Sequence, residues 1–309
     1  MRLATLTHAG RTVAAVLDPA SGLAHEIPDV DLDTLIRSGL PAALERGAAA
    51  LAGGTGQTGR GVPVADVRLE LPYRPAAIRD FVTFESHVEG VRRSIEGSPG
   101  VPEAWYDAPT FYFTNPHALY GPGVEVPRPA SSQRLDFELE VGVVLGAGGS
   151  SLSVAEAEAA IFGYTIVNDW SARDLQSREM QVGLGPAKGK DFATSIGPWI
   201  VTADEVAGYV DADGFLSLEC SVSVNGHRVG GDLLSNMGWT FPQMIAYASR
   251  DSLVVPGDLL ASGTTGGGGC LAELWGRAGE MVPPPLEPGD EVTMVVEGLG
   301  TLAGTVRRG

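Results

Sequence analysis

The sequence predicts a mainly β protein of the α+β class, with a small N-terminal α/β domain before a larger strand-rich domain. Short apolar or alternating segments bounded by Gly, Pro and Asn recur after residue 66 and are typical of strands, while helical patterns are few. The glycine-rich run GGTGQTGRGVP at 53–63 marks a boundary. We therefore expect one domain at 1–66 and another at 67–309, in a chain long enough for a large core.

The N-terminal domain is expected to combine a hairpin with helix. Residues 2–30 hold the β-forming segment RLATLTHAGRTVAAVLD, which has a Gly-containing turn, and then a further short strand. Residues 31–52 have a helical pattern, with Asp33 as the expected N-cap. This domain carries no chemical motif, so its expected role is a dimer contact or a cover over a site.

The larger domain is expected to be built from strands joined by tight turns. Asn225-Gly226 between two alternating runs predicts a β-hairpin. Strands are expected at 111–121, 134–146, 160–169, 197–206, 216–230, 257–264 and 290–300, and helices at 153–161, 171–180 and about 240–250.

Composition excludes several classes of function. A formal net charge of −17 argues against nucleic acid and anionic membranes as partners, because both require a basic face. Cys220 and Cys270 are too few for a disulfide framework or a cysteine zinc site. With no apolar leader or long apolar stretch, the protein is expected to be cytoplasmic.

Three carboxylates alternate with apolar residues in LDFELEVGVVLG at 135–146. On a strand, Asp136, Glu138 and Glu140 would share one face. This could be a solvated acidic face, but the uncharged continuation of the same face favours a buried strand whose carboxylates need partners. Glu138 and Glu140 could converge on a hard cation such as Mg²⁺, Mn²⁺ or Ca²⁺. The spacing alone leaves both interpretations open.

A second acidic position closes a buried strand in NDWSARDLQ at 168–176. Asp169 follows the apolar run AIFGYTIV, and Ser171 with Asp174 resembles a capping box for the next helix. Asp169 could be an ordinary turn residue. Beside Glu138 and Glu140 it would instead complete a set of carboxylates with open positions for water and substrate.

Three further segments carry candidate groups. In RDFVTFESH, His87 could be a general base if a carboxylate orients it, or a surface helix residue. In KGKDFATSIGPW, Lys190 could stabilise an oxyanion or be a solvated loop residue. The glycines of GDLLASGTTGGGG at 257–269 could bring backbone N–H groups to a ligand or form a hairpin tip. The other four histidines have simple surface interpretations: His8, His25, His117 and His227.

These five segments, in this order, resemble the fumarylacetoacetate hydrolase family over roughly residues 70–305. The resemblance implies a mixed β-roll or β-sandwich catalytic domain, usually dimeric, and a divalent cation, with Mg²⁺ first and Mn²⁺ or Ca²⁺ as alternatives. It also implies cleavage of a carbon–carbon bond in a small 1,3-dicarbonyl or 2-oxo acid. The matching motifs are DFxxxxxH at 80–87, LDFELEVGVVLG at 135–146, FGYTIVNDWSARDLQ at 162–176, GPAKGKDFATSIGPW at 185–199 and PGDLLASGTTGG at 256–267.

The resemblance also implies roles for individual residues. His87 matches the histidine that activates water, and Glu273 matches the glutamate that pairs with it. The positions that resemble the metal carboxylates are Glu138, Glu140, Asp169 and, as in the type enzyme, Asp80. The positions that resemble substrate-contacting or oxyanion-stabilising groups are Lys190, Gln176, Tyr112 and Thr264. Asp136 matches no ligand position and is expected to be structural.

Two positions depart from the type enzyme. Met180 stands where it has a tyrosine, and Glu96 where it has an arginine. Both positions help to grip fumarylacetoacetate, so a related oxo acid is the expected substrate. The expected function is a metal-dependent hydrolase of an acylpyruvate-type 2-oxo acid. The alternatives are a decarboxylase or isomerase of a 2-oxo or 2-hydroxydienoic acid in aromatic catabolism, and an inactive metal-binding scaffold.

Overall fold

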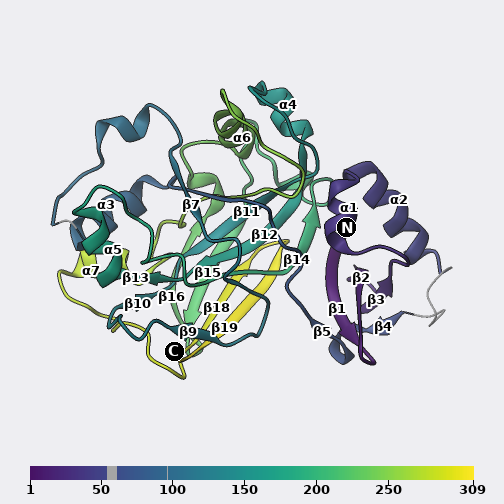
Figure 1. Ribbon diagram of the computed structural model, residues 1–309, viewed down its shortest axis with the longest axis horizontal. Helices are drawn as coiled ribbons and strands as arrows, with labels where there is room; N and C mark the ends of the chain where they lie inside the picture. Colours follow the sequence, from purple (N-terminus) through teal and green to yellow (C-terminus); the bar gives the residue numbers. More distant parts are fainter. Residues whose placement is uncertain (54–60, 96) are drawn as a thin grey trace.

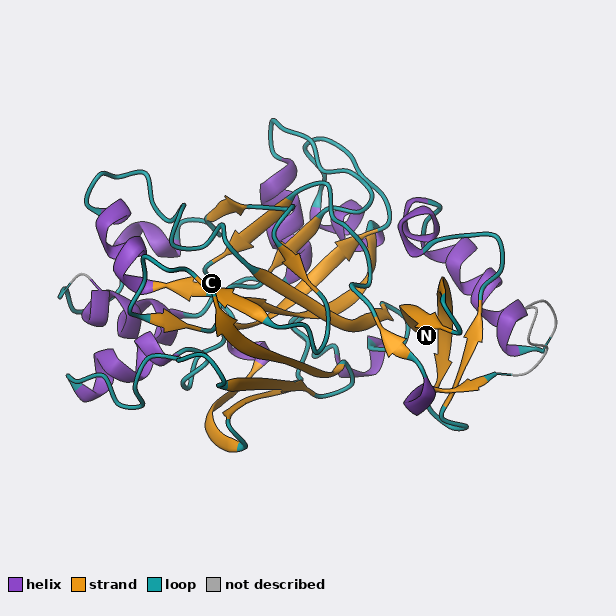
Figure 2. Cartoon of the chain, turned by 60° about the horizontal axis from the view of Figure 1, so that its bottom comes forward, coloured by secondary structure: helices purple, strands orange, loops and turns teal. Residues whose placement is uncertain are grey.

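A computed structural model describes residues 1–53, 61–95 and 97–309 (Figure 1). Most of the predicted boundary segment at 53–63, and Glu96, lie outside the described residues. Strands dominate both views, and helices lie around them (Figure 2). The predicted mainly β, α+β class is therefore confirmed.

A large mixed sheet forms the body of the molecule and contains twelve described strands. Its strands, in sheet order, are β4 (Val62–Pro63), β3 (Leu23–Glu26), β2 (Arg11–Asp18), β1 (Arg2–His8), β14 (Thr194–Thr202), β12 (Ile161–Asp169), β11 (Leu139–Leu145), β17 (Leu259–Ala261), β6 (Ile78–Phe81) and β7 (Phe111–Thr114), with β5 (Arg68–Leu69) beside β1 and β8 (Leu119–Tyr120) beside β14.

A second sheet of five described strands shares a hydrophobic core with the large sheet. Its order is β16 (His227–Leu233), β15 (Glu219–Val224), β18 (Glu291–Val296), β19 (Gly300–Arg308) and β9 (Val126–Arg128). The predicted hairpin joins β15 to β16, with positive φ at Asn225 and Gly226 as a two-residue turn of this kind requires. A small ribbon pairs β10 (Leu135–Asp136) with β13 (Ser171–Ala172).

Seven described α-helices and four short 3₁₀ turns complete the fold. They are α1 (Leu32–Arg37), α2 (Leu40–Leu51), α3 (Glu85–Ile95), α4 (Val154–Ala159), α5 (Arg173–Met180), α6 (Phe241–Ser249) and α7 (Leu271–Ala278), with η1 (Val64–Asp66), η2 (Glu103–Tyr106), η3 (Ala207–Tyr209) and η4 (Leu234–Asn236). Helices α3, α5 and α7 gather at the end of the molecule opposite the N-terminal strands (Figure 1). In the described part of the chain, no helix combines the length and apolar character needed to cross a membrane.

The central strands are buried on both faces, as their continuous apolar sequences predict. Every residue of β11 and β12 is buried. Val143 of β11 belongs to one hydrophobic core, and its neighbour Val144 belongs to another. Carboxylates carried by these strands therefore face protein rather than water.

Two capping predictions were wrong. Asp31 caps α1 by accepting a hydrogen bond from Thr34 N at 2.7 Å, whereas Asp33 accepts from Arg74 N across the fold. Helix α5 has no capping box at Ser171, because Asp174 accepts instead from Ser132 Oγ at 2.6 Å. In both cases a distant partner competes for the side chain that local spacing assigns to the helix.

The N-terminal strands extend the large sheet. Strand β1 pairs antiparallel with β14, with Arg2 opposite Val201 and Leu3 opposite Ile200. The hairpin predicted in this region is formed by β1 and β2, followed by the short strand β3. A division into domains at residue 66 remains a prediction.

Two glycines allow α3 and α7 to pack closely. A Cβ added to Gly276 of α7 would lie 2.0 Å from the carbonyl oxygen of Gly90 in α3, and a Cβ on Gly90 would lie 2.6 Å from Glu273 Cγ. A side chain at either position would push the helices apart. This contact sets the spacing between the helices that carry His87 and Glu273.

We predict that Gly276→Ala lowers the free energy of unfolding by about 1–3 kcal/mol, because the new methyl group cannot fit against the α3 backbone. Urea denaturation measures this change. Gly208→Ala is the matched control, since a Cβ there meets nothing within 4 Å. Equal stability of the two variants would contradict the close packing of α3 and α7.

Candidate functional site

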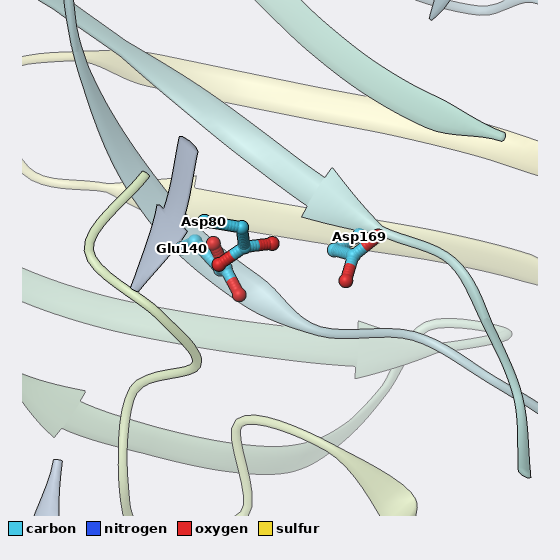
Figure 3. A group of neighbouring side chains, drawn as sticks. All are labelled: Asp80, Glu140 and Asp169. Atoms are coloured by element: carbon cyan, nitrogen blue, oxygen red, sulfur yellow. The ribbon is translucent and has the colours of Figure 1, made fainter. Parts of the chain in front are cut away.

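Three buried carboxylates from separate strands meet inside the large sheet. Asp80 lies on β6, Glu140 on β11 and Asp169 at the end of β12. Each offers one oxygen within 4.8 Å of those of the other two, and all three are at most 3% exposed. Figure 3 shows Asp80 and Glu140 side by side, with Asp169 projecting from the end of its strand. We call these three residues the acidic group.

The acidic group has oxygens that no donor in the described part of the chain satisfies. Glu140 Oε2 and Asp169 Oδ1 are buried without a hydrogen-bond partner. Burial, followed by the charge of Asp169, raises the pKa of Asp80 well above its ordinary range. Burial and then the charge of Asp80 do the same to the pKa of Glu140. Buried carboxylates this close together repel one another unless a proton or a cation intervenes.

Lys190 and Tyr112 border the acidic group. Lys190 Nζ donates to Asp169 Oδ2 at 2.5 Å and also to Glu138. The Tyr112 hydroxyl lies 2.9 Å from Asp80 Oδ2 and 2.5 Å from Asp169 Oδ2. The alternative that Lys190 is a solvated loop residue is excluded, because its side chain is only 3% exposed. Both residues lie beside the acidic group.

Glu138 stands beside the acidic group rather than in it. The predicted single strand is interrupted at 137–138, so Glu138 lies between β10 and β11 and loses the strict alternation with Glu140. Its carboxylate accepts from Arg173 Nη2 at 2.7 Å and from Lys190. Burial raises the pKa of Glu138, but the charges of Lys190 and Arg173 outweigh burial and hold it well below the ordinary range. Its role as a metal ligand remains a prediction.

His87 lies on α3, buried and close to Glu138. Its Nε2 is 3.9 Å from Glu138 Oε1, and its Nδ1 is 3.7 Å from Cys270 Sγ. Burial lowers the pKa of His87 to about 4, with Glu138 acting in the opposite direction and Arg173 and Lys190 adding to the decrease. The imidazole is therefore neutral at pH 7, as a general base must be.

Glu273 is buried in α7 but, within the described residues, forms no hydrogen bond or ion pair with His87. Its carboxylate forms an ion pair with Arg277. Burial raises the pKa of Glu273 to about 7, although Arg277 acts to lower it. The close contact of α3 with α7 places both groups on adjoining helices, and their direct pairing remains a prediction.

Arg173 is a site residue that the sequence reasoning missed. Its guanidinium donates to Asp136 Oδ2 at 2.8 Å, to Glu138 Oε1 at 2.7 Å and to Gln176 Oε1 at 3.0 Å. The available signal was a basic residue inside NDWSARDLQ beside several carboxylates. Gln176 is thus held at the edge of the charged cluster, and Thr264 Oγ1 lies 3.5 Å from Glu140 Oε1.

The acidic group fits a hard divalent cation. It offers only carboxylate oxygens, which suit Mg²⁺, Mn²⁺ and Ca²⁺. Its unpartnered buried oxygens on Glu140 and Asp169 are the atoms a cation would satisfy. Asp80, Glu140 and Asp169 could therefore hold such a cation, and Glu138 lies next to them.

Comparison with known proteins identifies the family. The family model for the C-terminal part of fumarylacetoacetate (FAA) hydrolase matches residues 76–307, which is most of the chain. The chain belongs to the fumarylacetoacetate hydrolase family. The resemblance in the five motifs is thus confirmed, and the family's members include hydrolases and isomerases.

Similar proteins within this family have several activities. Fumarylacetoacetase of Oryza sativa subsp. japonica is 29% identical, over 79% of this chain and 71% of that protein. The structure of 5-carboxymethyl-2-hydroxymuconate delta-isomerase from Mycobacterium smegmatis is 26% identical, with a TM-score of 0.70. Maleylpyruvate hydrolase from Sphingobium sp. SYK-6, in complex with manganese(II) and pyruvate, is 26% identical with a TM-score of 0.71. Both structural matches cover 100% of each chain, which confirms the family's fold.

We predict that Mn²⁺ raises the melting temperature of the wild-type protein but not that of Glu140→Ala. A cation that binds only the folded state adds about 2.7 kcal/mol to the free energy of unfolding when its free concentration is 100 times its Kd. Differential scanning fluorimetry with increasing MnCl₂ measures the shift, which should diminish at low pH as protons compete for Asp80 and Glu140.

Asp136→Ala serves as the comparison, because Asp136 lies outside the acidic group. This variant should be less stable yet still respond to Mn²⁺. Loss of the response in Asp136→Ala, or its persistence in Glu140→Ala, would contradict cation binding by the acidic group.

Proposed function

We propose that the chain is a divalent-cation-dependent hydrolase that cleaves a carbon–carbon bond in an acylpyruvate-type 2-oxo acid. The observation that carries this proposal is the buried imidazole of His87, whose Nε2 lies 3.9 Å from Glu138 Oε1 beside the charged cluster. Burial lowers the pKa of this imidazole to about 4, so the ring is unprotonated at neutral pH, as a general base must be. A water molecule between the imidazole Nε2 and a bound substrate carbonyl would be placed for deprotonation.

The remaining groups supply charge where the reaction needs it. A divalent cation held by the acidic group would polarise substrate oxygens as a Lewis acid. Lys190 is fixed by ion pairs with Glu138 and Asp169, so its positive charge would be in place to stabilise a developing oxyanion. Tyr112 and Gln176 present polar groups at the edges of the cluster and would orient the substrate. Burial of the cluster strengthens each of these interactions by excluding water.

The direct test is product analysis in ¹⁸O-labelled water. The purified protein, supplied with Mg²⁺ or Mn²⁺, is screened against acylpyruvates, fumarylpyruvate and oxaloacetate. Hydrolysis incorporates the label into the released acid. Turnover without label in the carboxylate of the released acid, or no turnover on the whole panel, would contradict the proposed hydrolase.

An isomerase or decarboxylase is the second candidate. Two observations favour it: Glu273 is paired with Arg277 rather than with His87, and a delta-isomerase matches this chain over its full length. In that reaction the same oxygen-rich cluster would stabilise an enolate, and a proton would return to a different carbon atom. The label experiment distinguishes this candidate, because isomerisation puts no ¹⁸O into a carboxylate.

We predict that His87→Ala lowers kcat by roughly 10²–10⁴, the usual contribution of a general base. Mn²⁺ affinity should remain unchanged, because His87 is not a member of the acidic group. Steady-state kinetics and Mn²⁺ titration measure the two effects. His227→Ala is the control, since that histidine is exposed at a hairpin. Activity retained in His87→Ala would exclude it as the base.

Three expectations accompany the proposal. The physiological cation is expected to be Mg²⁺, with Mn²⁺ supported by the manganese complex of the similar maleylpyruvate hydrolase. The protein is expected to be a cytoplasmic homodimer, as the family resemblance implies. Metal analysis of the purified protein tests the identity of the cation, and analytical ultracentrifugation tests the homodimer.

A further inference from the structure

The carboxylate of Asp136 joins three parts of the molecule although it is not in the acidic group. It is fully buried. Its Oδ1 accepts from the backbone N–H of Phe137 and of Leu271, both at 2.8 Å. Its Oδ2 accepts from Ala272 N at 2.9 Å and from Arg173 Nε at 2.8 Å. One side chain thus ties β10 to the start of α7 and to the start of α5.

The first connection fixes the N-terminus of α7. The first N–H groups of a helix have no partner within the helix and need an external acceptor. Asp136 accepts from the first two, and Cys270 Sγ accepts from the third, Glu273 N, at 3.4 Å. The same sulfur lies 3.7 Å from His87 Nδ1. The position of the α7 N-terminus therefore determines where Glu273 and Cys270 lie relative to His87.

The second connection fixes the guanidinium of Arg173. With Nε held by Asp136, the other two nitrogens donate to Glu138 Oε1 and Gln176 Oε1. Because the guanidinium is planar, fixing its Nε also fixes the directions in which its two terminal nitrogens donate. The position of the Glu138 carboxylate, which lies 3.9 Å from His87 Nε2, thus depends on the same Asp136 side chain.

We propose that Asp136 is a positioning residue that holds α7, with Glu273 and Cys270, and Arg173, with Glu138, in one fixed arrangement around His87. It contacts neither the acidic group nor the reacting atoms. Its kinetic consequence rests on the proposed function, whereas its effect on α7 does not. All four partners of Asp136 are hydrogen-bond donors, so the position requires two acceptor oxygens. The side-chain amide of an asparagine would place its NH₂ group against some of these donors.

The variant Asp136→Asn tests this role against the matched control Asp174→Asn. Asp174 undergoes the same chemical change on α5, but it accepts from Ser132 Oγ and Gln133 N and has no described hydrogen bond to α7. We expect amide hydrogen exchange across 271–278 to accelerate about tenfold or more in Asp136→Asn only. Mn²⁺ affinity should change by less than about twofold in both variants, since neither touches the acidic group.

Kinetics of a double-mutant cycle separate positioning from general destabilisation. We expect Asp136→Asn to lower kcat by about tenfold or more with little change in KM. In the double variant with Asp136→Asn and Glu273→Gln, kcat should fall by about as much as in the more impaired single variant. Both substitutions disturb the same arrangement around His87, so their effects should not multiply. If Asp136 were merely structural, the two losses would multiply.

A second variant covers the case in which Asp136→Asn fails to fold. Ala272→Pro removes one N–H donor to Asp136 without changing the carboxylate, and proline is tolerated in the first turn of a helix. It should also accelerate exchange across 271–278. Unchanged exchange there, or multiplying kinetic losses, would overturn the proposal. If the wild-type protein shows no turnover, the proposed function fails while the exchange data still decide whether Asp136 positions α7.

Discussion

The site depends on an excess of buried negative charge. Five buried carboxyl groups gather around two buried cationic side chains, and both cations are already shared between carboxylates. The carboxyl groups belong to Asp80, Asp136, Glu138, Glu140 and Asp169, and the cations are Lys190 and Arg173. Ionised carboxylates cannot remain unpaired in a protein interior, so the arrangement requires protons or a further cation.

The charges separate into two halves with different roles. Arg173 forms ion pairs with both Asp136 and Glu138 and fixes their orientation, so the partners of this half are protein groups. The other half retains unpartnered oxygens on Glu140 and Asp169. Lys190 lies at the junction, bound to Glu138 and Asp169. The half with unpartnered oxygens is therefore suited to binding a cation, and the half paired with Arg173 to holding the surrounding groups rigid.

The fold supplies the rigidity that this arrangement needs. Glu140 and Asp169 lie on antiparallel neighbours β11 and β12, whose residues are buried on both faces. Asp80 is carried by β6, which is joined to β11 through the short strand β17. Placement on paired strands restricts the side chains more than placement on loops would. Helices α3 and α7 pack through two glycines and hold His87 and Glu273 on adjoining helices.

The local sequence was sufficient to predict many of the strands and the burial of the strand that carries Glu140. The apolar continuation after Glu140 correctly predicted that its carboxylate is buried, and Asn225-Gly226 correctly predicted a hairpin. Pairings between distant residues could not be read from spacing. The interruption at 137–138 is one example, since Asp136 turns toward donors on α7 that lie 135 and 136 residues along the chain.

Arg173 and Glu273 illustrate the same limit at the site. Nothing local to Arg173 shows that it will bridge two carboxylates on another segment. The expected pairing of Glu273 with His87 depends on how two helices meet, and an arginine one turn along α7 takes the carboxylate in this structure. Helix α7 itself follows a glycine-rich run that obscures its start in the sequence.

The most direct test of the central claim is anomalous diffraction from crystals of the protein soaked in MnCl₂. An excess of buried negative charge that exists to hold a cation predicts one strong manganese peak among the carboxylate oxygens of Asp80, Glu140 and Asp169. No peak at this position, with the acidic group otherwise unchanged, would show that the charge is balanced by protons and would contradict the account.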